Sequence, residues 1–188
     1  CKLCVDACPR DAIEMKDTGK GENALVAAVN EAKCGGCGAC TGRCPTGAVQ
    51  LRHHTDDQLL GYLQVLLSDV NKMSPKIVAF CCDECGYATL DMVGMDGLKY
   101  PPNILPARVP CLGSVSLYHI FKSFEYGADG IMMLGCGKGN CQQLSSNGYQ
   151  EKVVAFARDI LNEIGLSSER LTAVFTCAAS SKDFLDAA

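Results

Sequence analysis

The sequence predicts an α+β unit built on an internal repeat, followed by a small α/β domain with a parallel sheet. The repeat joins residues 8–15 and 44–51, because Cys8-Pro9 and Cys44-Pro45 each precede a short alternating strand. From Lys76 onward, strand and helix patterns alternate, which favours parallel strands with right-handed crossovers. A chain of 188 residues that is 48% hydrophobic can bury two compact cores.

We expect the first unit at residues 1–52, a linker helix within residues 53–75, and the second unit at residues 76–188. Thr55 followed by Gln58 has the spacing of a capping box, which predicts the start of the helix. Leucines then recur at helical spacing to Leu67, and the helix is expected to run to about residue 71. Ser74-Pro75 interrupts the pattern and marks the boundary.

The second unit is predicted to contain four strands, at residues 77–80, 108–110, 130–134 and 171–175. Helices are expected between them, at residues 86–94, 116–126 and 150–164. A flavodoxin-like strand order of 2-1-3-4 would place the first and third strands side by side at the point where ligands bind in such sheets.

Cysteine is the unusual residue, with 14 copies. Their C-x-x-C spacings favour metal ligation in a reducing compartment over a disulfide framework. The run from Cys34 to Pro45 is a complete C-x₂-C-x₂-C-x₃-C-P motif, the spacing of bacterial-type ferredoxins with two [4Fe–4S] clusters. In such motifs the fourth cysteine serves the other cluster. One cluster, called cluster II below, should therefore be bound by Cys8, Cys34, Cys37 and Cys40.

The first run is shorter, because Cys1, Cys4 and Cys8-Pro9 match the motif only if Cys1 is the second ligand. The other cluster, cluster I, would then take Cys1, Cys4 and Cys44, with its fourth ligand upstream of Cys1. A zinc ribbon is the alternative, but zinc sites usually present two separated C-x₂-C pairs.

The second unit holds seven further cysteines, several of which follow predicted strands. In a parallel sheet these positions share the carboxyl edge, where ligands bind. A two-iron cluster needs four thiolates. We therefore expect a [2Fe–2S] cluster on Cys82, Cys85, Cys136 and Cys141, with Cys111 as a fifth candidate. Cys81 and Cys177 are expected to be packing residues, since free cysteine is often buried.

Two alternatives remain open for the second unit. Cys82 and Cys85 have the spacing of a redox dithiol, so the domain could be a thiol–disulfide reductase supplied with electrons by the ferredoxin unit. A tetrahedral zinc site on the same four cysteines would instead make it a docking module. No residues form a recognisable catalytic group of nucleophile and base.

Charge and hydropathy exclude other classes. The net charge is −4 and no basic stripe occurs, which argues against nucleic acid as a partner. No apolar run reaches the roughly 20 residues of a membrane span. We expect a cytoplasmic protein, associated with a membrane only through partner subunits.

Several motifs together resemble known families. The ferredoxin runs and the linker that follows them resemble the C-terminal end of the heterodisulfide reductase A-subunit family. The second unit resembles the delta subunit of methyl-viologen-reducing (F420-non-reducing) hydrogenase. The fusion order is similar to long A-subunit variants, including the B subunit of the quinone-interacting membrane-bound oxidoreductase (Qmo). The motifs are Phe80-Cys-Cys82-Asp-Glu-Cys85-Gly-Tyr87, Arg108-Val-Pro-Cys111, Gly127-Ala-Asp-Gly130 and Gly135-Cys136-x₄-Cys141.

The resemblance implies an electron-transfer segment of a multisubunit oxidoreductase. Electrons would pass between a flavin, two [4Fe–4S] clusters and a [2Fe–2S] cluster in the second unit. FAD would lie upstream or on a partner, and the partners would be other subunits of a heterodisulfide-reductase-like, hydrogenase or Qmo-type complex. Gly137 stands where hydrogenase delta subunits commonly have a histidine.

Overall fold

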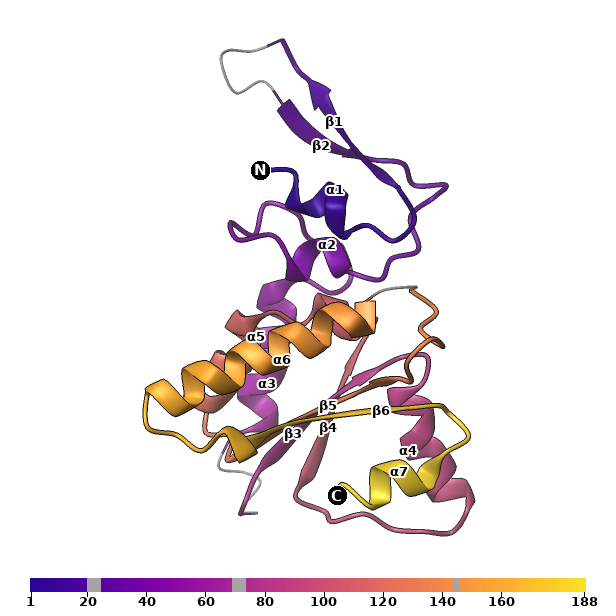
Figure 1. The fold of residues 1–188 in the computed structure, drawn as a ribbon, viewed down its shortest axis with the longest axis vertical. Helices are drawn as coiled ribbons and strands as arrows, with labels where there is room; N and C mark the ends of the chain where they lie inside the picture. Colours follow the sequence, from indigo (N-terminus) through magenta and orange to yellow (C-terminus); the bar gives the residue numbers. More distant parts are fainter. Residues whose placement is uncertain (20–24, 69–73, 144–145) are drawn as a thin grey trace.

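The computed structural model describes residues 1–19, 25–68, 74–143 and 146–188, and it places a small N-terminal unit against an α/β domain (Figure 1). The N-terminal unit contains α1 (Leu3–Ala7), β1 (Ile13–Asp17), β2 (Leu25–Val29) and α2 (Ala39–Gly42). The two strands form an antiparallel hairpin in which Ile13 is opposite Val29. This hairpin lies at the end of the molecule farthest from the α/β sheet (Figure 1).

Only one of the two copies of the internal repeat forms a strand. The first copy forms β1 as predicted, but the second copy forms no strand at residues 48–51. β1 pairs instead with β2, from the segment between the copies. In the second copy, Gln50 reaches forward to the next helix: its Oε1 accepts from the Asp56 backbone N–H at 3.0 Å, and its Nε2 donates to Asp56 Oδ2 at 2.8 Å.

The second unit is a four-stranded parallel sheet of β3 (Ile77–Cys82), β4 (Ile104–Val109), β5 (Gly130–Cys136) and β6 (Leu171–Thr176). The order is β4-β3-β5-β6, which confirms the predicted 2-1-3-4 arrangement. β4 begins four residues before the predicted strand and contains Pro106. Because β4 is an edge strand, a residue without a backbone N–H is tolerated there.

Helices cover both faces of this sheet, as Figure 1 shows. On one face lie α3 (Asp56–Leu66), α5 (Leu117–Glu125) and α6 (Ser146–Glu163), and on the other lie α4 (Gly86–Met95) and α7 (Ser181–Leu185). Each face has its own apolar core. The first core includes Leu63, Phe80, Ile120 and Leu161, and the second includes Leu90, Met132 and Phe184.

The predicted linker helix is α3, and it packs on the sheet. Its capping box is present: the Gln58 backbone N–H donates to Thr55 Oγ1 at 3.2 Å, and the Thr55 N–H donates to Gln58 Oε1 at 2.9 Å. Leu59, Leu63 and the following Leu67 are buried in the core shared with β3 and β5. Residues 69–71, where the predicted helix would end, lie outside the described residues.

A buried histidine connects α3 to α5. The Ser116 backbone N–H donates to His119 Nδ1 at 3.2 Å, and Nε2 on the other side of the ring lies 3.2 Å from Asp56 Oδ1. Because Nδ1 accepts a hydrogen bond, the ring proton of neutral His119 is on Nε2, facing the carboxylate. Burial, opposed by Asp56 and reinforced by His54, lowers the pKa of His119.

Candidate iron–sulfur sites

The four cysteines predicted for cluster II lie together. Cys8, Cys34, Cys37 and Cys40 all line one cavity of about 420 Å³ in the N-terminal unit. The segment that carries Cys34, Cys37 and Cys40 turns at Gly36 and Gly38, which have φ values of 65° and 74°, a region that favours glycine. The Ala12 backbone N–H donates to Cys8 Sγ at 3.3 Å. Such bonds stabilise thiolates and tune the potential of a bound cluster.

The pKa values of these thiols reflect their proximity. Burial and the nearby thiolates of Cys37, Cys8 and Cys34 raise the pKa of Cys40 to about 11. Burial likewise raises the pKa of Cys37, reinforced by Cys8 and Cys34. The cavity thus gathers four thiols that bound iron would hold as thiolates, since metal ligands must be deprotonated. These residues therefore fit a [4Fe–4S] cluster.

The residues predicted for cluster I come from the segments around α1 and α2, which pack against each other. Cys4 is buried on α1, Cys1 is exposed, and Cys44 follows α2. Cys44 Sγ lies 3.6 Å from Thr46 Oγ1. Burial opposes its ionisation, but the Thr46 hydroxyl and the backbone N–H groups of Val49, Thr46 and Ala48 lower the pKa of Cys44 to about 7. Within the described ranges, no hydrogen-bond contact joins the sulfur of Cys44 to that of Cys1 or Cys4.

In the α/β domain, the alternation of β3 separates two adjacent cysteines. Val78, Phe80 and Cys82 belong to the core beneath α3, α5 and α6, whereas Ala79 and Cys81 belong to the core beneath α4 and α7. Burial raises the pKa of Cys81 to about 12, and its Sγ donates to the Ala79 carbonyl at 3.2 Å. Cys81 is thus a packing residue, as predicted, and only Cys82 faces the other cysteines.

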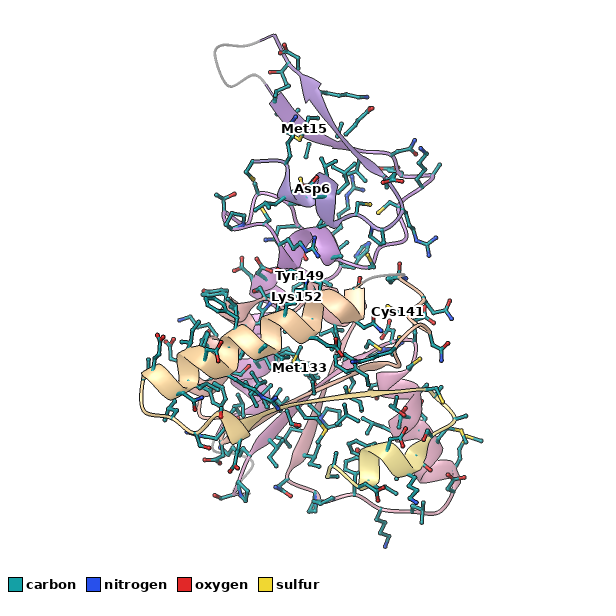
Figure 2. The ribbon with its side chains drawn as sticks, in the orientation of Figure 1. Asp6, Met15, Met133, Cys141, Tyr149 and Lys152 are labelled. Atoms are coloured by element: carbon teal, nitrogen blue, oxygen red, sulfur yellow. The ribbon has the colours of Figure 1, made fainter. Side chains whose placement is uncertain are left out.

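All five candidate thiols of the domain are linked by sulfur contacts. Cys82 Sγ and Cys136 Sγ are 3.7 Å apart. Cys136 also contacts Cys141 and Cys85, and Cys141 contacts Cys111. Cys141 lies on the loop between β5 and α6, on the side of the sheet that faces the N-terminal unit (Figure 2). The loops after β3, β4 and β5 therefore meet at one place, which we call the five-thiol site: Cys82, Cys85, Cys111, Cys136 and Cys141.

These contacts lower the pKa of some thiols of the site and raise the pKa of others. The contact with Cys136, opposed by burial, lowers the pKa of Cys82 to about 6, and backbone N–H groups of Gly86, Cys85 and Cys136 add to this effect. Cys111, with Cys136 second, lowers the pKa of Cys141. The pKa of Cys136 is raised by its contacts with Cys141 and Cys82. The site therefore favours thiolate at Cys82 and Cys141.

The donor set fits a metal centre by its chemistry. Two thiolates on one tetrahedral metal, with metal–sulfur bonds of about 2.3 Å, are about 3.8 Å apart, which is close to the 3.7 Å between Cys82 and Cys136. Four thiolates hold a two-iron centre, and the five-thiol site offers five. In the described part of the chain, no group of three or more His, Cys, Asp or Glu side chains is arranged so that it could hold a single metal ion.

Cys177 is the exception to the predictions for this domain. In contrast to the buried packing residue that the sequence predicts, its side chain is exposed. Cys177 comes directly after β6, where its carbonyl oxygen accepts from Thr89 Oγ1 at 3.3 Å. The last strand thus ends with its cysteine in solvent, outside the five-thiol site.

Glycines shape the site in a way that the cysteine spacing alone does not reveal. The Gly86 N–H donates to Cys82 Sγ at 3.2 Å, and a Cβ at Gly86 would overlap the carbonyl oxygen of Leu134. A Cβ at Gly135 would overlap the side chain of Leu112. These glycines can be recognised in the sequence because each stands next to a candidate ligand, in Cys85-Gly86 and Gly135-Cys136.

Comparison with known families finds a match in each of the two units. The family described as methyl-viologen-reducing hydrogenase, delta subunit, matches residues 77–188. The 4Fe-4S dicluster domain matches residues 1–48. Among the described residues, no helix is both long enough and apolar enough to cross a bilayer.

Individual relatives match one or both units. The iron-sulfur D subunit of the vhu F420-non-reducing hydrogenase of Methanocaldococcus jannaschii is 35% identical over 115 residues, covering 61% of this chain and 86% of the relative. The corresponding vhc D subunit of Methanococcus voltae is 36% identical over 110 residues, covering 58% and 76%. The A subunit of the ferredoxin:CoB-CoM heterodisulfide reductase of Methanosarcina mazei is 32% identical over 208 aligned positions, covering 95% of this chain but 26% of the relative.

Proposed function

Because the chain belongs to the methyl-viologen-reducing hydrogenase delta-subunit family, with a 4Fe-4S dicluster domain before it, we propose that it relays electrons between two [4Fe–4S] clusters and a [2Fe–2S] cluster. Cys8, Cys34, Cys37 and Cys40 would hold cluster II. Cys1, Cys4 and Cys44 would hold cluster I, together with one ligand from an upstream segment. The [2Fe–2S] cluster would take four of the five thiols of the α/β domain.

The observation that carries this proposal is the meeting of five cysteines from three loops. Packing alone gives no reason for cysteine at the carboxyl ends of three neighbouring strands, where α/β sheets bind ligands. Backbone N–H groups of Gly86 and Gly113 donate to Cys82 Sγ and Cys111 Sγ at 3.2 and 3.4 Å. Iron–sulfur centres use such donors to set their potentials.

The wider context of the relay follows from the relatives. We propose that the electrons reach or leave this segment through a flavin, upstream or on a partner, and that the chain works in a hydrogenase, heterodisulfide-reductase or Qmo-type complex. The match across 95% of this chain to the heterodisulfide reductase of Methanosarcina mazei supports this assignment. Its cellular place would be the cytoplasm, with any membrane contact made through partner subunits.

Thiol–disulfide reduction is a second candidate, favoured by one observation. The pKa of Cys82 is lowered to about 6 by its contact with Cys136, which would keep it a thiolate at neutral pH and thus able to attack a disulfide. The reductase interpretation uses Cys82 and Cys85 but gives no role to Cys111 or Cys141. The relay is favoured because it gives a role to four of the five thiols.

Metal analysis and EPR of the full chain, purified without oxygen, test the proposal. After reduction with dithionite we expect a rhombic [2Fe–2S] signal together with the [4Fe–4S] signals. Cys136→Ser should abolish the [2Fe–2S] signal, because Cys136 contacts three other thiols of the site. Cys81→Ser and Cys177→Ser are matched controls, one buried and one exposed, and both should retain it.

Each alternative has its own outcome. Stoichiometric zinc without iron at the five-thiol site would contradict the relay and support a docking module. A site free of metal, with a dithiol that titrates reversibly and requires both Cys82 and Cys85, would support the reductase. A [2Fe–2S] signal that survives the loss of both Cys82 and Cys136, which leaves three of the five thiols, would contradict the assignment of this cluster to the five-thiol site.

A further inference from the structure

The two units meet through the segments that carry their cysteines. α2, which contains Cys40, lies against a short 3-10 helix, η1 (Leu112–Ser114), that directly follows Cys111. A Cβ at Gly42 would overlap the carbonyl oxygen of Gly113, so the two backbones touch there without a side chain between them. A Cβ added at Gly113 would lie 3.3 Å from the Ala39 Cβ. Glycine permits this approach on both sides of the contact.

A second contact joins the same two sites. The Arg10 guanidinium lies over Gly35, and its Nε donates to Gln143 Oε1 at 3.4 Å. Arg10 is two residues from Cys8, Gly35 is next to Cys34, and Gln143 is two residues from Cys141. Both contacts therefore connect residues flanking the cluster II ligands with residues flanking the five-thiol site.

The ligands of cluster I have fewer connections to the five-thiol site. Cys4 lies on α1, and the contact nearest to Cys44 is Arg43, whose guanidinium carbon is 3.7 Å from the ring centre of Tyr149. Tyr149 is part of α6 and not of a loop that carries a cysteine of the site. Gly42 lies two residues from Cys44 as well as from Cys40, but the Arg10–Gln143 contact adjoins ligands of cluster II only, so the contacts of the described residues favour cluster II as the neighbour of the five-thiol site.

We infer that cluster II is the electron-transfer neighbour of the five-thiol site and that the Gly42–Gly113 contact sets their separation. This inference rests on the proposed relay function and adds its order, which is cluster I, cluster II and then the five-thiol centre, in either direction. The step moves one electron from the reduced centre to the oxidised one, and no bond or proton is exchanged. Arg10 and Gln143 hold the two ligand loops in place from the other side.

Gly42→Ala in the full chain tests the contact. We expect normal iron and sulfide content but a weaker magnetic interaction between the reduced [2Fe–2S] centre and cluster II, and slower electron exchange between them. Hydrogen exchange at residues 112–114 should increase whether or not the clusters are loaded. Gly61→Ala is the matched control, since Gly61 lies within α3 with no atom within 4 Å of an added Cβ. It should behave as the wild type does.

A milder pair of variants keeps the test informative if Gly42→Ala does not fold. Arg10→Ala removes an exposed side chain and its bond to Gln143, whereas Lys33→Ala removes the same charge beside Cys34. Only Arg10→Ala should weaken the magnetic interaction. An unchanged interaction and electron-exchange rate in both Arg10→Ala and a fully loaded Gly42→Ala would overturn the role of the contact.

The identity of the neighbouring cluster is tested separately. Cys37→Ser should remove cluster II and with it the enhanced relaxation of the [2Fe–2S] signal, while Cys44→Ser should leave that enhancement in place. The reverse result would overturn the proposed order while leaving the relay function intact. A wild-type protein without a [2Fe–2S] signal would instead contradict the relay itself, and the inference with it.

Discussion

Replacing Leu63 with alanine tests whether α3 is an integral part of the α/β domain. The Leu63 side chain is 0% exposed and belongs to the core shared with β3 and β5. Removing three carbon atoms forfeits about 2.4 kcal/mol of burial at about 0.8 kcal/mol per carbon. The cavity left among Leu59, Leu67 and the sheet adds to this cost, within the range of about 2–5 kcal/mol for buried leucine. We therefore expect the free energy of unfolding to fall by about 3 kcal/mol.

Urea denaturation followed by circular dichroism measures this change. Val65→Ala is the control on the same helix, because Val65 is 72% exposed and should change the free energy of unfolding by less than about 0.5 kcal/mol. The midpoint should fall for Leu63→Ala while the slope of the transition stays constant. Equal effects of the two variants would refute the packing of α3 on the sheet.

Two further predictions concern pH and iron. Burial holds the pKa of His119 below its usual 6.5, so the unfolded chain takes up a proton first as the pH falls, and stability should decline below about pH 6.5 through the folded-state pKa. Urea midpoints at several pH values should show this slope, and His119→Gln should reduce it, while His54, whose pKa burial also lowers, supplies the remainder. An equal slope in the variant would contradict the assignment. Removing iron with a chelator should increase hydrogen exchange in residues 1–48 but leave β3 and β5 protected. The reason is that the N-terminal unit buries few apolar side chains. Unchanged exchange in residues 1–48 would show that the unit folds without its clusters.

Where the fold can be predicted, local pattern and tertiary packing agree. The strands of the α/β domain are apolar runs separated by helices, a pattern that permits few topologies, and the predicted order follows from it. β4 begins four residues before the predicted strand and includes Pro106, which lacks an N–H and would interrupt a strand pattern. Its position at the sheet edge removes that objection, and the Pro106 carbonyl oxygen accepts from the Tyr62 hydroxyl at 2.9 Å. The edge position depends on the whole sheet, so no local signal reveals it.

The N-terminal unit is harder to predict, because the two copies of its repeat have similar sequences but form different structures beside different neighbouring segments. Residues 44–51 match residues 8–15 in sequence, yet Gln50 caps the start of α3 at Asp56 and the segment forms no strand. The cysteine spacing does predict that the four thiols of cluster II lie together, because tight spacing gathers ligands whatever the strand pairing. It cannot predict the glycine contact between the units, which requires the relative position of α2 and η1.

The two adjacent cysteines of β3 have a consequence for how the strand finds its register. If β3 shifted by one residue, Cys81 would replace Cys82 at the five-thiol site, and a metal would still find a thiolate there. The same shift would move the large Phe80 into the position of the smaller Cys81, in the buried core beneath α4 and α7, and would leave the small Ala79 in the position of Phe80. Correct assembly of the metal centre is therefore enforced by the unequal sizes of two apolar neighbours, which bind no metal themselves.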